Sequence, residues 1–305
     1  MPGDVNINFD PTKPVTVMVE KIANLIGAVG APAQIKRIAK AESEALLIRT
    51  DAENKAKKLE LIAEQDRELV ERTFHRIAYE ETRKQENIES ITTLALPQLD
   101  DDAKPENVDD DWLLNFLEKC RITSSAEMQQ LWARILAGQA NNPGEFSKRT
   151  VNFVAELDKS EAEQFTTLCR YCWNGKPLIY DVHHPIYTDN GINFQMLSHL
   201  DHIGLITFSP IGGYRFDFAT LEDIGIAEYF GQTSAIRFRE GRTSLSFGHV
   251  MMTQTGVQLE PICNATPVPG FRDFIHEQWR EEGVTIIPDD HISERPDGSI
   301  SIGKE

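Results

Sequence analysis

Two cysteines and two histidines in the middle of the chain are residue types that bind zinc. Cys169 and Cys172 form a Cys-x-x-Cys pair, and His199 and His202 form a His-x-x-His pair further along the chain. Two thiolates and two imidazoles can hold one zinc ion in tetrahedral geometry. These four residues define a candidate metal site, and a zinc-dependent enzyme that uses them is one hypothesis for the function.

Ordinary packing also accounts for these residues, and we prefer that interpretation. Cys169 and Cys172 continue the apolar face of a predicted helix, where a free cysteine acts as a small hydrophobic residue. His199 and His202 alternate with apolar residues of another predicted helix, which places them on its solvent side. Because these spacings match no standard zinc finger, we expect no cofactor. We also single out no catalytic residue in the sequence.

The sequence lacks the common catalytic motifs and the charge of a nucleic-acid-binding protein. It has no G-x-S-x-G, no phosphate-binding G-x-x-x-x-G-K-[S/T] and no H-E-x-x-H. Its formal net charge of -17 opposes binding to phosphate backbones and to anionic membranes. Residues 177–232 contain one basic residue, Arg215. A transcription regulator is therefore a disfavoured alternative, and we expect no nucleic-acid partner.

A long helix is predicted to organise the chain, because residues 33–96 contain neither glycine nor proline. Its apolar positions return every eleven residues, a period that keeps a stripe nearly straight along an α-helix. Such a helix needs a partner for its stripe. Either it self-associates, or it folds back near residues 85–87. The predicted oligomer seam comprises Ala41, Ala45, Ile48, Ala52, Ala56, Leu59, Ala63, Val70 and Phe74.

A short amphipathic helix is predicted over residues 15–29. Its apolar face could pack on the protein or a neighbouring subunit, or lie on a membrane surface. Four cysteines without a signal peptide, and no apolar run of the roughly 20 residues that span a bilayer, indicate a cytoplasmic protein. Peripheral contact with the inner membrane would use this face. The face comprises Val15, Met18, Val19, Ile22, Leu25 and Ile26.

The predicted fold is mainly α, with an α+β C-terminal part. A helix, the phrase LSHLDHIGLI and a hairpin turning at Gly212–Gly213 follow the order of a winged-helix-like domain. The predicted segments are an N-terminal helix (1–32), a long helix or coiled coil (33–96), an acidic linker (97–111), a small helical bundle (112–175), a winged-helix-like domain (176–287) and a polar tail (288–305).

Part of this chain resembles a known family. The run LWARILAGQANNPGEFSKRTVNFVAELDKSEAEQF, residues 131–165, resembles the signature of an uncharacterised bacterial domain-of-unknown-function family, and is more distantly similar to the Abi-alpha abortive-infection family. A Thr-x-x-Gly-x-x-Leu step follows at Thr253, Gly256 and Leu259. The resemblance covers about residues 110–280. It implies a bacterial or prophage origin and a role in phage defence, and it carries over no catalytic residue.

We therefore expect an oligomeric, non-catalytic interaction or scaffold protein of antiphage defence. Its long helix would assemble a homo-oligomer, and its C-terminal domain would bind a protein partner.

Overall fold

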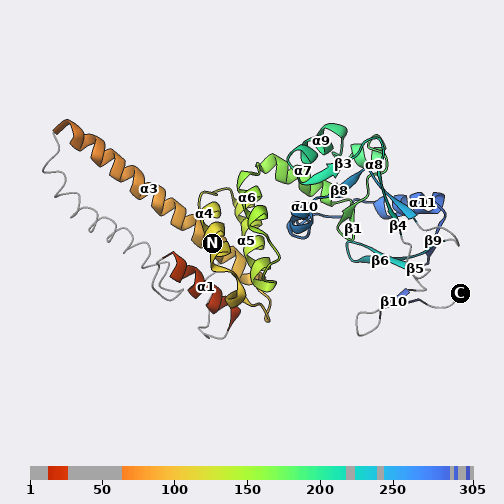
Figure 1. Cartoon of the computed structure of the whole chain (residues 1–305), viewed down its shortest axis with the longest axis horizontal. Helices are drawn as coiled ribbons and strands as arrows, with labels where there is room; N and C mark the ends of the chain where they lie inside the picture. The colour runs from red at the N-terminus through yellow and green to blue at the C-terminus, as the bar shows by residue number, and fades with distance from the viewer. Residues whose placement is uncertain are drawn as a thin grey trace. The chain divides into compact units, whose positions relative to one another are not determined.

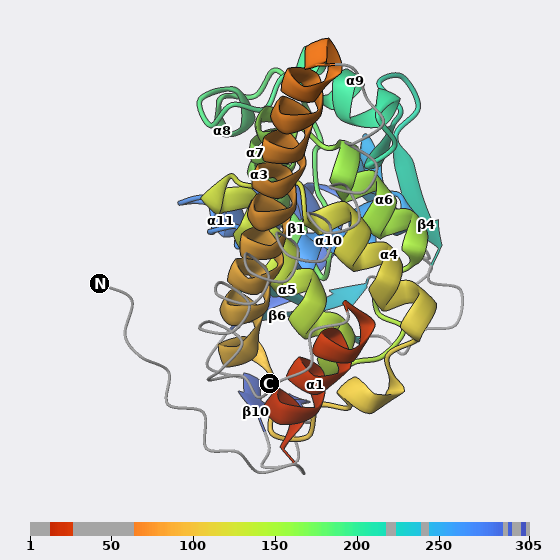
Figure 2. The ribbon, with the colours of Figure 1, turned by 90° about the vertical axis from the view of Figure 1, so that its left-hand side faces the viewer.

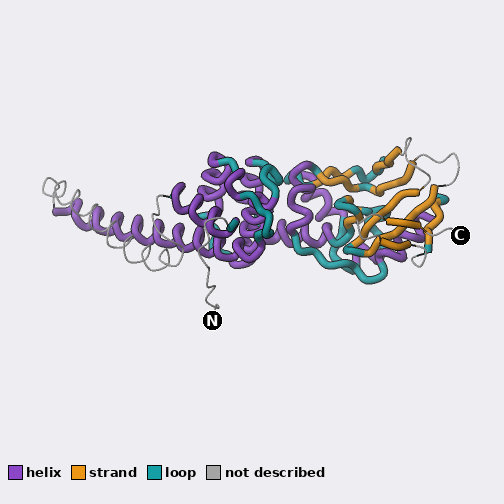
Figure 3. Tube along the Cα trace, turned by 90° about the horizontal axis from the view of Figure 1, so that it is seen from below, coloured by secondary structure: helices purple, strands orange, loops and turns teal. Residues whose placement is uncertain are grey.

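The chain folds into two compact units, Met1–Glu156 and Leu157–Glu305 (Figure 1). The first is helical, and the second combines helices with small antiparallel sheets, shown as purple and orange in Figure 3. This confirms the predicted mainly α chain with an α+β C-terminal part. The computed structural model describes residues 13–26, 64–217, 224–238, 244–288, 292–294 and 300–302.

The helices of the first unit pack around a core of aromatic rings. Trp112 stacks on Phe116 with ring centroids 5.3 Å apart, and Phe116 meets Trp132 edge-on at the same separation. The indole Nε1 of Trp112 donates to the carbonyl of Phe146 at 2.7 Å. The elements are α1 (Pro14–Leu25), α3 (Glu64–Ala95), η1 (Leu96–Gln98), η2 (Pro105–Asn107), α4 (Asp110–Cys120), α5 (Ala126–Asn141) and α6 (Lys148–Glu156).

α3 runs through residues 85–87 without interruption, so the chain does not fold back there. The segment contains good helix formers and no residue that would break the helix. Of the predicted long helix, residues 33–63 lie outside the described part of the chain.

The segment 97–111, which we predicted to be an acidic linker in water, packs against the first unit. Ala103, Pro105 and Val108 are buried between the acidic residues. The backbone N–H of Lys104 donates to the carbonyl of Ala140 on α5 at 2.8 Å. Small apolar residues thus fix this stretch to the unit while its carboxylates stay in water.

The second unit begins earlier than the boundary that we predicted after residue 175. α7 contacts α9 rather than completing the first helical bundle. The helices of this unit are α7 (Lys159–Cys169), α8 (Pro185–Thr188), α9 (Phe194–His202), α10 (Gln254–Leu259), η3 (Glu260–Ile262) and α11 (Phe271–Glu281). Its strands are β1 (Cys172–Trp173), β2 (Lys176–Pro177), β3 (Ile206–Phe208), β4 (Tyr214–Asp217), β5 (Ile224–Tyr229), β6 (Gln232–Phe238), β7 (Ser244–Gly248), β8 (Val250–Met252), β9 (Val284–Ile287), β10 (Ile292–Glu294) and β11 (Ile300–Ile302).

The strands on either side of Gly212–Gly213 do not pair with each other as a hairpin, which corrects the sequence prediction. β3 pairs with β8, and β4 pairs with β7, both antiparallel. Gly213 has a φ of +62° and lies so close to Gly248 that an added Cβ would stand 2.9 Å from that carbonyl oxygen. The glycines therefore shape an outward turn between β3 and β4, and the pairing partners come from later in the chain.

A second sheet has the strand order β5-β6-β9. β5 and β6 are joined by Phe230 and Gly231, both at positive φ, the geometry of a tight two-residue hairpin turn. α11 contacts β9 and buries Phe271, Ile275 and Trp279. This packing forms the core of the sheet region.

The Thr-x-x-Gly-x-x-Leu step spans α10, from its N-cap Thr253 to its last residue Leu259. The hydroxyl of Thr253 accepts from the backbone N–H of Gly256 at 3.2 Å and donates to the carbonyl of Gly204 at 2.7 Å. A Cβ on Gly256 would lie 2.2 Å from the carbonyl oxygen of Leu205, and Leu259 is buried. The motif therefore docks a helix closely against the end of α9, which is a structural role.

Candidate interaction surface on α3

α3 carries one continuous stripe of side chains whose spacing alternates between four and three residues. This is the heptad spacing that keeps a stripe facing a partner helix. The stripe has apolar residues at both ends and an ion pair in its middle, with Lys84 Nζ 2.6 Å from Glu81 Oε1. Its positions are Val70, Phe74, Ile77, Glu81, Lys84, Ile88, Ile91 and Ala95.

The C-terminal part of the stripe is covered within the unit. Ile88, Ile91 and Ala95 are buried, and α3 contacts α5 extensively. Figure 2 shows α3 and α5 side by side. This part of the stripe therefore belongs to the core.

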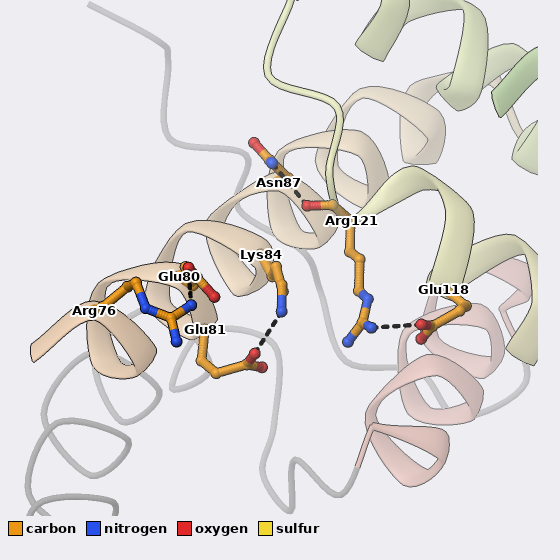
Figure 4. A network of polar contacts seen from close by, with 7 residues as sticks. All are labelled: Arg76, Glu80, Glu81, Lys84, Asn87, Glu118 and Arg121. Atoms are coloured by element: carbon orange, nitrogen blue, oxygen red, sulfur yellow. Dashed lines mark hydrogen bonds and ion pairs between the residues drawn. The ribbon is translucent and has the colours of Figure 1, made fainter. Parts of the chain in front are cut away.

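A buried polar cluster fixes the position of α3 at the start of this interface. The side-chain amide of Asn87 donates to the carbonyl of Arg121 at 2.8 Å (Figure 4). The Gln129 amide donates to Asn87 Oδ1 at 3.1 Å. Ser90 donates to Gln129 Oε1 at 2.8 Å. Because buried polar groups need partners, a shift of α3 along α5 would leave these groups unsatisfied. The cluster thus sets the register.

The N-terminal part of the stripe is partly exposed. No described side chain of residues 68–86 is buried, and Ile77 is 41% exposed. Val70 and Phe74 are partly exposed on the same side. The apolar stripe therefore continues beyond the part that α5 covers.

Charged side chains along this part of α3 are paired within the helix. Arg76 lies 2.9 Å from Glu80, and Arg72 lies 3.6 Å from Glu68. Figure 4 shows the Arg76–Glu80 and Lys84–Glu81 pairs. Exposed pairs of this kind contribute only about 0.2–1 kcal/mol to stability. Their consequence here is that the helix presents little net charge beside the apolar stripe.

The predicted seam is described only in part. Val70 and Phe74 lie on the partly exposed N-terminal part of α3. Ile77 was missed, because the eleven-residue pattern selected position 78 instead. The heptad spacing that continues from the buried Ile88 back to Ile77 would have identified it. Outside the described residues lie Ala41, Ala45, Ile48, Ala52, Ala56, Leu59 and Ala63.

The apolar face of α1 packs on the first unit. Met18, Val19 and Ile22 are buried, whereas Val15, Leu25 and Ile26 are partly exposed. α1 contacts η2 and α4, beside which it lies in Figure 2.

A lysine fastens α1 in this position. The Lys21 ammonium lies 3.0 Å from the Asp110 carboxylate and also donates to the carbonyls of Glu106 and Val108. Half of the residues of the face that we considered for a membrane are therefore buried in the protein. Among the described helices, none has the length and apolarity needed to cross a membrane.

The structure does not bring the candidate zinc ligands together. Cys169 and Cys172 are buried, and burial raises the pKa of both thiols above the ordinary range. His199 Nε2 lies 2.9 Å from Glu161 Oε1, and His202 is exposed at the end of α9. Within the described residues, no group of three or more His, Cys, Asp or Glu side chains is placed to hold a metal ion.

A buried serine–histidine contact was not apparent in the sequence. Ser234 Oγ on β6 lies 2.9 Å from His276 Nε2 on α11. Arg272 Nη2 donates to the same oxygen at 3.2 Å and to the carbonyl of Thr233 at 3.0 Å. Ser234 is fully buried, so a substrate cannot reach its hydroxyl. We interpret the contact as a polar link between sheet and helix.

Comparison with known proteins places the chain in a family. A family model described as "Protein of unknown function (DUF2806)" matches residues 71–275, more than half of the chain, so the chain belongs to that family. The match confirms the predicted domain of unknown function; a relationship to Abi-alpha is not shown. No curated protein and no solved structure matches.

Proposed function

We propose that this member of the DUF2806 family is a non-catalytic interaction protein that assembles with further copies of itself. The uncovered part of α3 would be the seam, packing as a short coiled coil. The observation that carries the proposal is the single heptad stripe that is buried at Ile88 and Ile91 but uncovered at Ile77.

Burial of this stripe gives the association its driving force. Fully burying an isoleucine or phenylalanine side chain is worth about 1.5–3 kcal/mol, and these partly exposed side chains would gain a fraction of that. In a symmetric assembly each copy contributes Val70, Phe74 and Ile77, so every copy adds its own free energy of burial. The intrahelical ion pairs remove the net charge that would otherwise oppose contact between identical helices.

Co-expression of two copies with different affinity tags tests this proposal. We expect the second tag to co-purify through the first, and to do so in high salt, because the seam is apolar and salt screens only charge interactions. Complete separation of the tags in both low and high salt would contradict it.

For the second unit we propose a winged-helix-like arrangement that binds a protein. The order of α7, α8 and α9, followed by the paired strands β3–β8 and β4–β7, supports this assignment. Arg215, the one basic residue of residues 177–232, pairs with Glu282 at 3.5 Å, which argues against DNA.

A role in phage defence is the biological context that we propose for this assembly. It rests only on the distant similarity to the Abi-alpha abortive-infection family that we inferred from residues 131–165 of the sequence. Plating phage on cells with and without the gene tests it: protection by the gene is expected, and equal plaque numbers would remove defence from the proposal.

A further inference from the structure

The turn between β3 and β4 presents an isoleucine to solvent. Ile211 is 98% exposed, at the tip of residues 209–213. The Ser209 N–H donates to the carbonyl of His249 at 2.9 Å, and the Gly213 N–H donates to the carbonyl of Ser209 at 3.3 Å. His249 Nδ1 also lies 2.8 Å from the Ser209 carbonyl oxygen. These hydrogen bonds close the turn, so the backbone that carries the exposed Ile211 side chain is held in place.

Two aromatic rings accompany this turn. Phe194, the first residue of α9, is 51% exposed, and its ring lies 5.4 Å from that of Phe208 at the end of β3. The Asn193 side chain caps α9 by accepting from the backbone N–H of Met196 at 3.0 Å. We call Phe194, Phe208 and Ile211 the α9–turn patch. All three stand on backbone that is held by hydrogen bonds.

The surroundings of the patch are acidic. Asp201 is exposed on α9, and its carboxylate accepts from the backbone N–H of Phe208 at 3.2 Å. Asp189 is exposed just before α9. Arg215 is already paired with Glu282. Asp201 thus places a carboxylate beside the Phe208 end of the apolar patch.

We propose that the α9–turn patch is the docking site for a basic amphipathic segment of a partner protein. The apolar side of that segment would cover Ile211 and Phe194, while its Lys or Arg side chains would face Asp201 and Asp189. Apolar anchors of this kind dominate binding energy in protein interfaces, and the charge would select a basic partner. This inference rests on the proposed protein-binding role of the second unit and is independent of assembly through α3.

Two labelled helical peptides of equal length test the site, one built from leucine and lysine and the other from leucine and glutamate. Fluorescence anisotropy would measure their binding to the full chain. We expect the lysine peptide to bind and the glutamate peptide not to bind. Ile211→Asp should weaken binding by roughly tenfold or more, as loss of a central anchor does. Phe194→Ala should weaken it in the same direction.

Ile122→Asp is the matched control, because Ile122 is an isoleucine of the first unit that is 67% exposed. It changes the net charge by the same amount and should leave binding unchanged. Equal effects of the two aspartate variants would show that Ile211 contributes no more to binding than Ile122 does, and would overturn the proposal. Absence of lysine-peptide binding, or equal binding of both peptides, would also overturn it.

Two further measurements separate this proposal from others. Co-sedimentation of the wild type with phosphatidylcholine vesicles, lost in Ile211→Asp, would assign the patch to lipid instead of protein and overturn the proposal. Ile77→Glu on α3 should bind the lysine peptide as the wild type does, even if its assembly is lost. Failure of the α3 seam is thereby distinguished from failure of this site.

Discussion

The side-chain amide of Asn87 donates to the backbone carbonyl of Arg121 at 2.8 Å, which ties α3 to the end of α4. The same asparagine accepts from Gln129 on α5. One residue therefore joins three helices of the first unit at the point where the stripe of α3 changes from covered to uncovered.

Replacement of Asn87 should destabilise the first unit. Asn87→Ala removes the side-chain partner of the Arg121 carbonyl and one of the two acceptors of the Gln129 amide, and an unsatisfied buried group costs about 1–3 kcal/mol. Urea unfolding followed by tryptophan fluorescence would measure the loss. Glu86→Ala, at the exposed neighbouring position, should change stability by less than about 0.5 kcal/mol. Equal effects of the two substitutions would mean that the cluster does not hold α3.

Gly256→Ala should destabilise the second unit by about 1–3 kcal/mol or more, because its Cβ would stand 2.2 Å from the Leu205 carbonyl oxygen. Gly212→Ala is the control: its Cβ would meet Ser209 Oγ at 3.6 Å, an ordinary contact. Thermal unfolding of both variants gives the comparison. If Gly256→Ala unfolds at the wild-type temperature, the close approach that we assign to the motif is wrong.

The pair of cysteines should behave as packing residues without metal. We expect purified protein to contain no stoichiometric zinc by mass spectrometry, and a chelator to leave its unfolding temperature unchanged. Cys169→Ala should destabilise the fold by removing a buried side chain. One equivalent of zinc, released by the chelator with loss of structure, would contradict this and restore the metal hypothesis.

Glu260 gives a pH-dependent prediction. Burial raises the pKa of its carboxyl group above the ordinary value, because the charged form loses hydration. The folded state therefore holds this proton more tightly than the unfolded state, and the carboxyl destabilises the fold as pH rises above its unfolded pKa. Glu260→Gln should raise the urea midpoint at pH near 7, and the gain should shrink at pH near 4. A gain that is independent of pH would refute the assignment.

Much of the helical fold was predictable because its signals are local. Residues 112–117 and 128–136 show the apolar periodicity of α4 and α5, and the lack of glycine and proline predicts α3 across 85–87. Helical contacts recur within a few residues, so a single sequence reveals them.

The strand partners and the buried polar contacts were not predictable in this way. β3 pairs with β8 across more than 40 intervening residues, whereas the sequence favoured a local hairpin at Gly212–Gly213. Ser234 and His276 meet although they lie 42 positions apart. Such pairings depend on the tertiary fold, and residue spacing carries no signal for them.

The stripe of α3 differs in phase from the stripe that the eleven-residue pattern selects. Both the eleven-residue and the heptad patterns pass through Val70 and Phe74, and they diverge at positions 77 and 78. The buried Ile88 and Ile91 select the heptad, and only the structure shows that these two residues are covered.

The molar mass of two matched variants tests the central claim most directly. Ile77 lies on the uncovered stripe, whereas Tyr79, 68% exposed, lies on the opposite side of the same helix. Ile77→Glu would place a carboxylate in the seam, and a buried unpaired charge costs several kcal/mol. Light scattering after size exclusion should show a multiple of 34.5 kDa for the wild type and for Tyr79→Glu, and a lower mass for Ile77→Glu. A wild-type mass of one chain, or the same mass for both variants, would contradict assembly through α3.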